Sequence, residues 1–243
     1  MIKKINIFLV LLLLLLSIGA VSAVDDANST VMSSDDAIDI AAHEGDNLLS
    51  SDAAGGELLA SAVHVVNSSN YNNYFTSKGE LLPSSLNEGD TLQIDGSFSG
   101  KDFSFRKQVN VVGTSTNDMK ECTFKLFEGA SGSTISNLKI TNTKDYCYGI
   151  FLDGAQNCTI QGCIINNTGQ SSYTICLANN ATYNNVSNNV LHTYGKTYGH
   201  LTRSTPPLLL NNAHHNYIGN NRITCDDANG IYLSSYEGGP LKG

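Results

Sequence analysis

Aliphatic and polar residues follow a layout that recurs four times in the second half of the chain. Each copy has an aliphatic residue, then Asn or Gly two positions later, then a second aliphatic residue five positions after the first. The copies are Ile135–Ile140, Ile160–Ile165, Val186–Leu191 and Ile218–Ile223, and the interval before the last copy is the longest. An internal repeat with a period of about 25 residues is typical of a solenoid, in which each copy packs on its neighbours.

The third position of each copy indicates a turn, because two aliphatic residues five apart in a straight strand face opposite sides. That position is held by Asn137, Gly162, Asn188 and Asn220. These residue types tolerate a left-handed backbone at low cost. Beyond the turn, the fourth and sixth positions point inward, which places Asn189 and Asn221 inside. A buried Asn needs a paired amide, so we expect Asn189 to lie over Asn221 in a hydrogen-bonded ladder.

Short apolar runs bounded by polar residues indicate buried strands between these turns. They are Gly149–Leu152, Thr174–Leu177, Pro207–Leu210 and Gly230–Leu233, and less regular earlier candidates are Thr91–Asp95, Phe103–Phe105, Gln108–Val112 and Cys122–Phe124. The pattern predicts an all-β fold: a right-handed parallel β-helix, a single-stranded solenoid of about 25 residues per coil. The alternative is an antiparallel β-sandwich in which the similar Asn-rich turns arise by chance.

The two ends of the predicted solenoid differ. The segment Tyr71–Leu82 is rich in aromatic and aliphatic residues, and we expect it to cover the N-terminal end, where strand edges would otherwise stay unpaired. No such segment follows Gly230–Leu233 before the chain stops at Gly243. We therefore expect the solenoid to be incomplete at its C-terminal end, with further modules beyond Gly243 or a partner on the last coil.

The N-terminal segment, which precedes the predicted solenoid, indicates export. Lys3 and Lys4 precede an apolar run from Ile7 to Leu16 and a small-residue stretch ending at Ala23, so residues 1–23 form a predicted signal peptide. A retained membrane anchor is the alternative, but the apolar run is short for a bilayer. Residues 24–62 form a predicted disordered acidic spacer, leaving 63–243 as the β-helix domain. We expect a secreted or cell-surface protein without a membrane span after cleavage.

The charge of the chain is concentrated in the spacer. Residues 24–60 hold nine of the 22 acidic residues and no Lys or Arg, and Lys3 and Lys4 are the basic residues before them. This leaves 13 acidic and 12 basic residues from Ser61 onward. Without a basic stripe the sequence excludes nucleic acid as a partner.

Six cysteines offer two outcomes that the sequence leaves open. They are Cys122, Cys147, Cys158, Cys163, Cys176 and Cys225. An exported protein is able to form disulfides, but Cys158, Cys163 and Cys176 lie in or beside apolar strands, where a thiol packs as a small hydrophobic group. None of the spacings fits a zinc site, so we expect no metal there.

With its leader, acidic spacer and Asn-rich coils, the chain resembles the adhesin-like secreted proteins of methanogenic archaea, which carry pectate-lyase-like right-handed β-helices. The resemblance extends from Lys3-Lys4 through Asn67–Phe75 and Gly89–Ile94 to the four repeats. It implies a surface role and this architecture, and it names no ligand. The same fold class includes polysaccharide lyases and glycoside hydrolases, so catalytic residues have to be argued one by one.

The candidate catalytic residues lie in and after an insertion. Residues 194–207 supply the extra length of the longest repeat, and Asp226 and Asp227 follow on the next coil. Glycoside hydrolysis needs one protonated and one ionised carboxyl group, which makes Asp226, Asp227 and His200 the candidates. Polygalacturonase-like enzymes have an Asp pair before a Gly-His-Gly turn and an Arg-Ile-Lys strand. Here Gly199-His200 precedes the Asp pair and no Arg-Ile-Lys occurs, so we expect no catalytic set.

A calcium site of the pectate-lyase kind needs several convergent acidic residues. Only Asp153 and Asp226 are candidates for one face, and they do not make a set. We therefore expect no cofactor and no metal.

The insertion is also a candidate ligand-binding loop. Tyr194 and Tyr198 are suited to stacking on sugar rings, while His200 and Arg203 are suited to donating hydrogen bonds. The alternative is a plain surface loop. The sequence thus favours an adhesin-like protein that binds a cell-surface glycan or protein. An extracellular polysaccharide-degrading enzyme is the first alternative and a structural cell-envelope protein the second.

Overall fold

The computed structural model describes residues 61–195 and 205–235. The predicted signal peptide and nearly all of the predicted spacer lie outside the described residues, and so does the part of the insertion at 196–204. The end of the chain from 236 to 243 lies outside them too.

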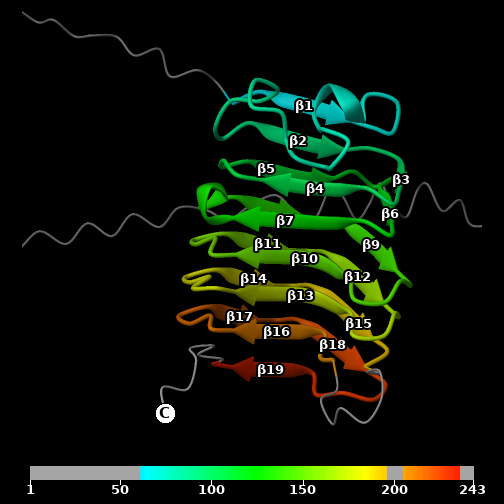
Figure 1. Ribbon diagram of the computed structural model, residues 1–243, viewed down its shortest axis with the longest axis vertical. Coiled ribbons are helices and arrows are strands. Elements are labelled where there is room, and N and C mark those ends of the chain that lie inside the picture. Colours follow the sequence, from blue (N-terminus) through cyan, green and yellow to red (C-terminus); the bar gives the residue numbers. More distant parts are fainter. Residues whose placement is uncertain (1–60, 196–204, 236–243) are drawn as a thin grey trace, which may run out of the picture. The chain divides into compact units, whose positions relative to one another are not determined.

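Within these described residues, nineteen strands form three sheets that run side by side (Figure 1). The first sheet contains β1 (Val63–Val66), β2 (Thr91–Ile94), β5 (Asn110–Gly113), β8 (Thr134–Ser136), β11 (Thr159–Gln161), β14 (Asn185–Ser187) and β17 (Tyr217–Gly219). The second contains β3 (Ser97–Ser99), β6 (Asp118–Lys120), β9 (Lys139–Asn142), β12 (Ile164–Asn167), β15 (Val190–Thr193) and β18 (Arg222–Cys225). The third contains β4 (Asp102–Phe105), β7 (Thr123–Phe127), β10 (Tyr148–Asp153), β13 (Tyr173–Ala178), β16 (Leu208–Asn211) and β19 (Ile231–Ser234).

Each strand pairs in parallel with its equivalent on the next coil, so the fold is a parallel β-solenoid. Within the first sheet, Ile160 is in register with Ile135 on one side and with Val186 on the other. In the third sheet Ile150 is in register with Ile175, which pairs in turn with Leu208. The bounds of the first-sheet strands confirm the predicted coil of about 25 residues, with a shorter coil from β2 to β5 and a longer one at the insertion. The antiparallel sandwich is wrong, because every pairing between the named strands is parallel.

Three corners connect the sheets within each coil. The first corner joins the first sheet to the second, the second corner joins the second sheet to the third, and the third corner returns to the first sheet of the next coil. The predicted turn residues form the first corner, and all of them have positive φ: Asn137 (56°), Gly162 (65°), Asn188 (58°) and Asn220 (54°). The left-handed corner predicted from the repeat is therefore confirmed.

The predicted Asn ladder is present just after the first corner. Asn189 is 1 % exposed, and its Nδ2 donates to Oδ1 of Asn221 at 3.0 Å. The same Oδ1 accepts the backbone N–H of Asn189 at 2.9 Å, and Nδ2 of Asn221 donates to the carbonyl of Val186. On its other side, Oδ1 of Asn189 accepts the backbone N–H of Cys163 at 2.9 Å. Each amide thus satisfies backbone groups of the adjacent coil, which is what makes its burial tolerable.

A second Asn ladder, which the sequence analysis did not identify, lies just before the first sheet. Nδ2 of Asn184 donates to Oδ1 of Asn216 at 3.0 Å, and Oδ1 of Asn184 accepts the backbone N–H of Cys158 at 2.8 Å. Both ladders have the same order along the axis, with a Cys followed by two Asn residues. The sequence carried the signal, since Cys158, Asn184 and Asn216 each stand two positions before the first aliphatic residue of a repeat.

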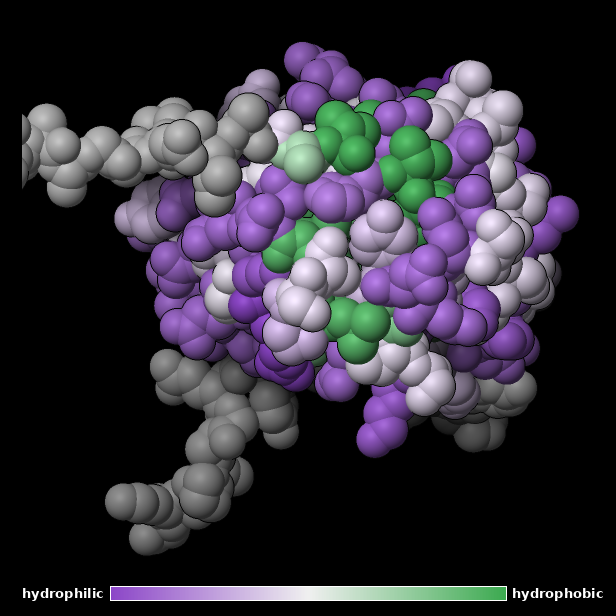
Figure 2. Space-filling model, turned by 90° about the horizontal axis from the view of Figure 1, so that it is seen from above, coloured by the Kyte–Doolittle hydropathy of each residue, from purple (hydrophilic) through white to green (hydrophobic). Residues whose placement is uncertain are grey.

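The interior of the solenoid is apolar, and its N-terminal end is rich in aromatic rings. Phe103 stacks on Phe124 with ring centroids 4.5 Å apart, and it meets Tyr71, Phe75 and Phe98 edge to face. Tyr71 begins the short 3-10 helix η1 (Tyr71–Asn73), and both Tyr71 and Phe75 are buried. The predicted lid is therefore confirmed. Figure 2 shows this end from above, where apolar side chains form separate spots among polar ones.

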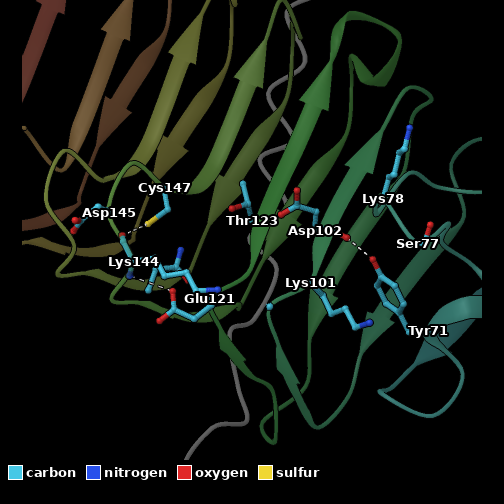
Figure 3. Close-up of a pocket in the computed structure, with 12 residues that line it drawn as sticks. Tyr71, Ser77, Lys78, Lys101, Asp102, Glu121, Thr123, Lys144, Asp145 and Cys147 are labelled. Carbon is cyan, nitrogen blue, oxygen red and sulfur yellow. Dashed lines mark hydrogen bonds between the residues drawn. The ribbon is translucent and has the colours of Figure 1, made fainter.

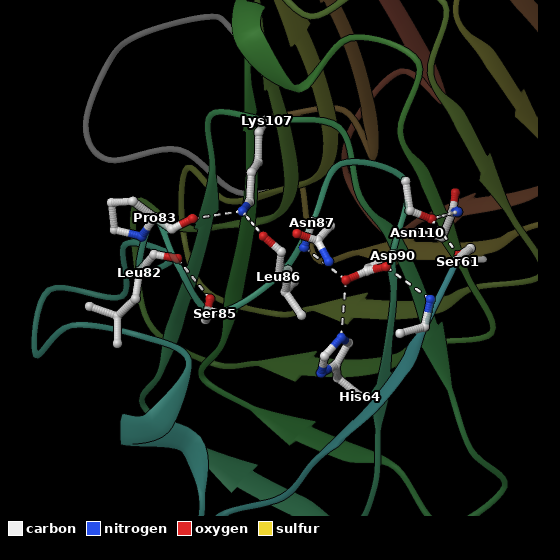
Figure 4. A network of polar contacts seen from close by, with 12 residues as sticks. Ser61, His64, Leu82, Pro83, Ser85, Leu86, Asn87, Asp90, Lys107 and Asn110 are labelled. Carbon is white, nitrogen blue, oxygen red and sulfur yellow. Dashed lines mark hydrogen bonds and ion pairs between the residues drawn. The ribbon is translucent and has the colours of Figure 1, made fainter. Parts of the chain in front are cut away.

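A buried carboxylate ties the end of the connection between β1 and β2 back to β1 (Figure 4). Asp90 is 2 % exposed and accepts the backbone N–H groups of Asn87 at 2.7 Å and Ala62 at 2.9 Å, while His64 Nε2 lies 3.1 Å from its Oδ2. These backbone hydrogen bonds, followed by the contact with His64, hold the pKa of Asp90 below its ordinary value. Lys107 donates to the carbonyls of Pro83 and Leu86 in the same connection.

All six cysteines lie within the described residues, and all are free thiols. Of the two outcomes left open, disulfide formation is thus absent. Cys122, Cys158, Cys163 and Cys176 are buried. Burial raises the pKa of Cys122 to about 11 and that of Cys163 and Cys176 to about 12, so these thiols stay protonated and pack as small hydrophobic groups.

Candidate functional site

A polar cleft of about 420 Å³ lies along the second corner, over the first coils (Figure 3). Its wall is built from equivalent positions on successive coils. Lys101 lies between β3 and β4, Glu121 between β6 and β7, and Lys144 between β9 and β10. Tyr71 and Lys78, from the connection between β1 and β2, close its N-terminal end. The cleft is therefore a product of coil stacking, which brings together residues distant in the sequence.

Asp102 is the first residue of β4, where the third sheet forms one wall of the cleft, and it makes an ion pair with a lysine of the same sheet. Its Oδ2 lies 2.8 Å from Nζ of Lys125, which stands on the next strand of the third sheet, two residues after the register partner Thr123. The hydroxyl of Tyr71 donates to the backbone carbonyl of Asp102. Burial, and then the nearby charge of Asp102, raise the pKa of Tyr71 to about 12, so the phenol remains a neutral donor.

Glu121 is held in place by the coil below it. Thr143 donates to its Oε1 from both the hydroxyl, at 2.6 Å, and the backbone N–H, at 3.0 Å, and the backbone N–H of Lys144 donates to Oε2 at 3.2 Å. Burial on its own would raise the pKa of Glu121, but these hydrogen bonds outweigh it and keep that pKa below its ordinary value. Glu121 is therefore an ionised, positioned carboxylate.

The far end of the cleft is formed by Asp145 and Cys147. Oδ1 of Asp145 accepts the backbone N–H of Gln170 at 2.7 Å, which ties the loop to the coil below. The thiol of Cys147 lies within hydrogen-bonding distance of the Lys144 carbonyl and the Ser172 hydroxyl. Burial raises the pKa of Cys147, so this thiol is a weak donor rather than a nucleophile.

The three lysines that line the cleft make no ion pair with another described residue. The ion pairs between described residues are His64–Asp90, Lys120–Asp118 and Lys125–Asp102, and none of them includes Lys78, Lys101 or Lys144. All three are exposed, and Lys101 places its Nζ 4.9 Å from the centroid of the Tyr71 ring. The charge of Lys144 also contributes to the lowered pKa of Glu121, so the cleft combines lysines and carboxylates that act on one another.

An aromatic cluster borders the cleft in the third sheet. Tyr148 directly follows Cys147, and its ring stacks on Tyr173 at 5.6 Å and on Phe151 at 4.9 Å. All three are half-buried, so each ring keeps some surface in contact with solvent. Aromatic faces next to polar groups are the usual composition of a carbohydrate-binding surface.

The insertion predicted to bind a ligand leaves from the same corner, farther along the axis. It follows β15 and precedes β16, and its base is closed by the backbone N–H of Thr205, which donates to the Gly195 carbonyl at 3.1 Å. Tyr194 lies at this base and is half-buried. Tyr198, His200 and Arg203 lie outside the described residues.

The structure places the carboxylate candidates at two different corners. Asp226 and Asp227 are exposed at the second corner, directly after β18, and the backbone N–H of Asp226 donates to the Thr193 carbonyl at 3.3 Å. Asp153 ends β10 at the third corner, where Oδ1 accepts a hydrogen bond from Nδ2 of Asn179 at 2.6 Å. The shared face suggested for Asp153 and Asp226 is therefore wrong, because the third sheet separates the two corners.

Among residues 61–195 and 205–235, no three His, Cys, Asp or Glu side chains converge in a way that would hold a metal ion. No helix in this part of the chain combines the length and apolar character needed to cross a bilayer. Comparison of the chain with family models, with curated proteins and with solved structures finds no match. The function therefore has to be argued from the geometry of the second corner.

The sequence analysis missed the cleft for a physical reason. Its lining residues come from the earliest coils, where the first-sheet strands β2 and β5 start closer together than later ones and the repeat pattern is weakest. Lys101, Glu121 and Lys144 share one signal, since each stands at the junction of two short strands. Such a position identifies each of them as a corner residue. That the three line one cleft follows only from the register of the coils.

Proposed function

We propose that this protein is an exported, adhesin-like β-solenoid that binds carbohydrate along its second corner and does not cleave it. The leader and acidic spacer expected from the sequence support export of the solenoid to the cell surface, where glycans are exposed. The observation that carries the proposal is the cleft bordered by the stacked rings of Tyr148, Tyr173 and Phe151. Polar groups in a shallow cleft orient sugar hydroxyls, and the aromatic faces pack on the apolar faces of the rings.

The state of the carboxylates favours binding over hydrolysis. A glycoside hydrolase needs a carboxyl group that stays protonated near neutral pH, which requires a raised pKa. Glu121 has a lowered pKa, because three hydrogen bonds stabilise its ionised form. Asp102 is paired with Lys125 and so serves to shape the cleft. Asp226 and Asp227 are exposed at a bend, a setting that suits a solvated turn.

The insertion extends the proposed surface along the axis. Its base, where Tyr194 lies, is at the second corner, on the same flank of the solenoid as the cleft. Tyr198, His200 and Arg203 lie outside the described residues and remain part of the proposed surface as candidates from the sequence. A ligand long enough to run along this flank would meet the cleft first and the insertion two coils later. This favours a polymeric glycan over a single sugar.

The test is binding of the full exported chain to a panel of polysaccharides, by glycan array and by calorimetry. Replacing both Tyr148 and Tyr173 by Leu keeps apolar volume but removes the ring faces, and should weaken binding about 10- to 30-fold. Tyr198→Ala with Arg203→Ala should weaken it as well. The matched control is Tyr217→Leu, whose ring is 59 % exposed in the first sheet, and which should bind as the unmodified protein does.

Turnover is measured on the same panel. We expect no release of reducing or unsaturated sugars. Release that is lost on Asp226→Asn would replace this proposal by an enzyme, and absence of binding to every glycan would leave a structural envelope protein.

A further inference from the structure

Two adjacent histidines face each other at the third corner, in the connection between β16 and β17. Nδ1 of His214 lies 2.7 Å from Nδ1 of His215, with the two ring planes inclined at 76°. Both side chains are exposed. Two ring nitrogens at this distance share one proton at most, because two N–H groups would repel each other. The same two nitrogens are therefore able to share a cation instead of a proton.

The preceding coil holds both rings in this orientation. Nε2 of His214 lies 3.0 Å from Oδ1 of Asn180, and because that oxygen only accepts, Nε2 carries the proton and Nδ1 of the neutral ring keeps its lone pair. The ring of His215 stacks on Tyr183 with centroids 5.2 Å apart and planes inclined at 20°. A histidine that donates from one ring nitrogen to an oxygen and keeps the other free has the arrangement usual for metal ligands.

The distance between the two nitrogens suits a metal ion with right-angled coordination. With metal–nitrogen bonds of about 2.0 Å, two nitrogens at 90° lie about 2.8 Å apart, as in square-planar or tetragonal Cu²⁺ and Ni²⁺ complexes. At the tetrahedral angle that Zn²⁺ prefers, they lie about 3.3 Å apart. The observed 2.7 Å is close to the first value, so the rings of His214 and His215 would have to part only slightly.

The corner has room for the rest of a coordination shell. A hollow of about 280 Å³ opens beside His214, and Asn212, Ser234 and Ser235 are among its lining residues. No group of three His, Cys, Asp or Glu side chains converges within residues 61–195 and 205–235. The remaining positions around an ion would therefore be filled by water, which makes the site an exposed chelate rather than a closed structural one.

We propose that His214 and His215 chelate a divalent transition-metal ion through their two Nδ1 atoms, and that they take Cu²⁺ in preference to Zn²⁺. On binding, His215 changes tautomer: its Nδ1 proton passes to solvent and its Nε2 takes one up, so each ring stays neutral. The inference does not depend on carbohydrate binding, because the third sheet separates this corner from the cleft. It departs from the sequence analysis, which expected no metal and did not use the adjacent histidines.

The test uses the untagged full chain carrying Cys147→Ser and Cys225→Ser. These two half-buried thiols would otherwise bind Cu²⁺ or be oxidised by it. Titration calorimetry should show one ion per chain, with affinity rising from Co²⁺ through Ni²⁺ to Cu²⁺ and lower for Zn²⁺ than for Cu²⁺. Electron paramagnetic resonance of the Cu²⁺ complex should show coupling to two nitrogens.

Histidine variants locate the ion. His214→Gln and His215→Asn should each weaken Ni²⁺ and Cu²⁺ binding at least about tenfold. Asn is chosen because residue 215 has a φ of 56°. Asn180→Gly removes the acceptor of Nε2, and should weaken binding about tenfold while the resonance still shows two nitrogens. The matched control is His192→Gln, whose single ring contacts Thr224, and which should bind normally.

Three outcomes would overturn the inference. The first is the absence of a one-to-one complex with a two-nitrogen signal in the unmodified histidine pair. The second is binding that survives both His214→Gln and His215→Asn while circular dichroism shows the fold intact. The third is tighter binding of Zn²⁺ than of Cu²⁺, which would reject the right-angled chelate. None of these outcomes bears on glycan binding, which is measured separately.

Discussion

Replacing Asn189 by Ala will lower the free energy of unfolding by about 2–6 kcal/mol. The amide of Asn189 accepts the backbone N–H of Cys163 at 2.9 Å and donates to the Ile160 carbonyl at 3.0 Å. Ala removes both partners and leaves two buried backbone groups unpaired, each costing about 1–3 kcal/mol. Urea unfolding followed by circular dichroism measures the loss.

The matched control for this variant is Asn185→Ala, four residues earlier in β14. Oδ1 of Asn185 is buried and has no hydrogen-bond partner in the described part of the chain. Removing this amide therefore breaks no bond from that oxygen to a neighbouring coil, and we expect a loss below about 1 kcal/mol. Equal losses in the two variants would show that the ladder does not stabilise the coils.

Replacing Phe103 by Ala will cost about 3–5 kcal/mol, the usual range for a fully buried ring. Phe103 is 0 % exposed, stacks on Phe124, and meets Tyr71, Phe75 and Phe98 edge to face. Its loss opens a cavity where the lid packs on the first complete coil. Thermal unfolding should show a lower midpoint, and limited proteolysis should cut the Tyr71–Leu82 segment earlier than in the unmodified protein.

Phe151→Ala is the matched control, because it removes the same side chain from a half-buried position instead of a fully buried one. Phe151 belongs to the same sheet but is half-buried and stacks on Tyr148 in the cluster that borders the cleft. Its removal leaves no enclosed cavity, so we expect a loss of about 1–2 kcal/mol. A cost for Phe103→Ala no greater than this would contradict the account of the N-terminal core.

The coils could be predicted because the residue types within each repeat, above all Asn or Gly at the turn, determine where the chain bends. Only Asn and Gly occur at the third position, and all four adopt positive φ at the first corner. The pairing of Asn189 with Asn221 followed, because an inward Asn needs a partner and the equivalent position on the next coil supplies one. The ladder of Asn184 and Asn216 rests on the same logic, applied two positions before the repeat.

The cleft could not be predicted because no local pattern brings its residues together. Lys101, Glu121 and Lys144 stand in three coils of unequal length, and their alignment depends on how those coils are in register. Before that register is known, each is one exposed corner residue among many. The acidic pair Asp226-Asp227 is the opposite case: a local pattern pointed to catalytic carboxylates, but both residues lie exposed at a bend.

In-register stacking of the coils aligns both the ladders and the cleft, and a disulfide cross-link tests it directly. Ile164 and Val190 are register partners in β12 and β15, and both are exposed on the outer face of the second sheet. Neighbouring strands lie about 4.8 Å apart. That spacing suits a disulfide, whose Cα atoms are usually about 4.4–6.8 Å apart. The variant Ile164→Cys with Val190→Cys should therefore form a disulfide under mild oxidation, detected by mass spectrometry of its peptides.

The control pairs Ile164→Cys with Arg222→Cys, one coil farther along, since Arg222 is in register with Val190. Two strand spacings separate these positions by about 9.6 Å, which is too far for a disulfide. The account predicts a cross-link for residues 164 and 190 and none for 164 and 222. A cross-link at 164 and 222, or none at 164 and 190, would contradict it.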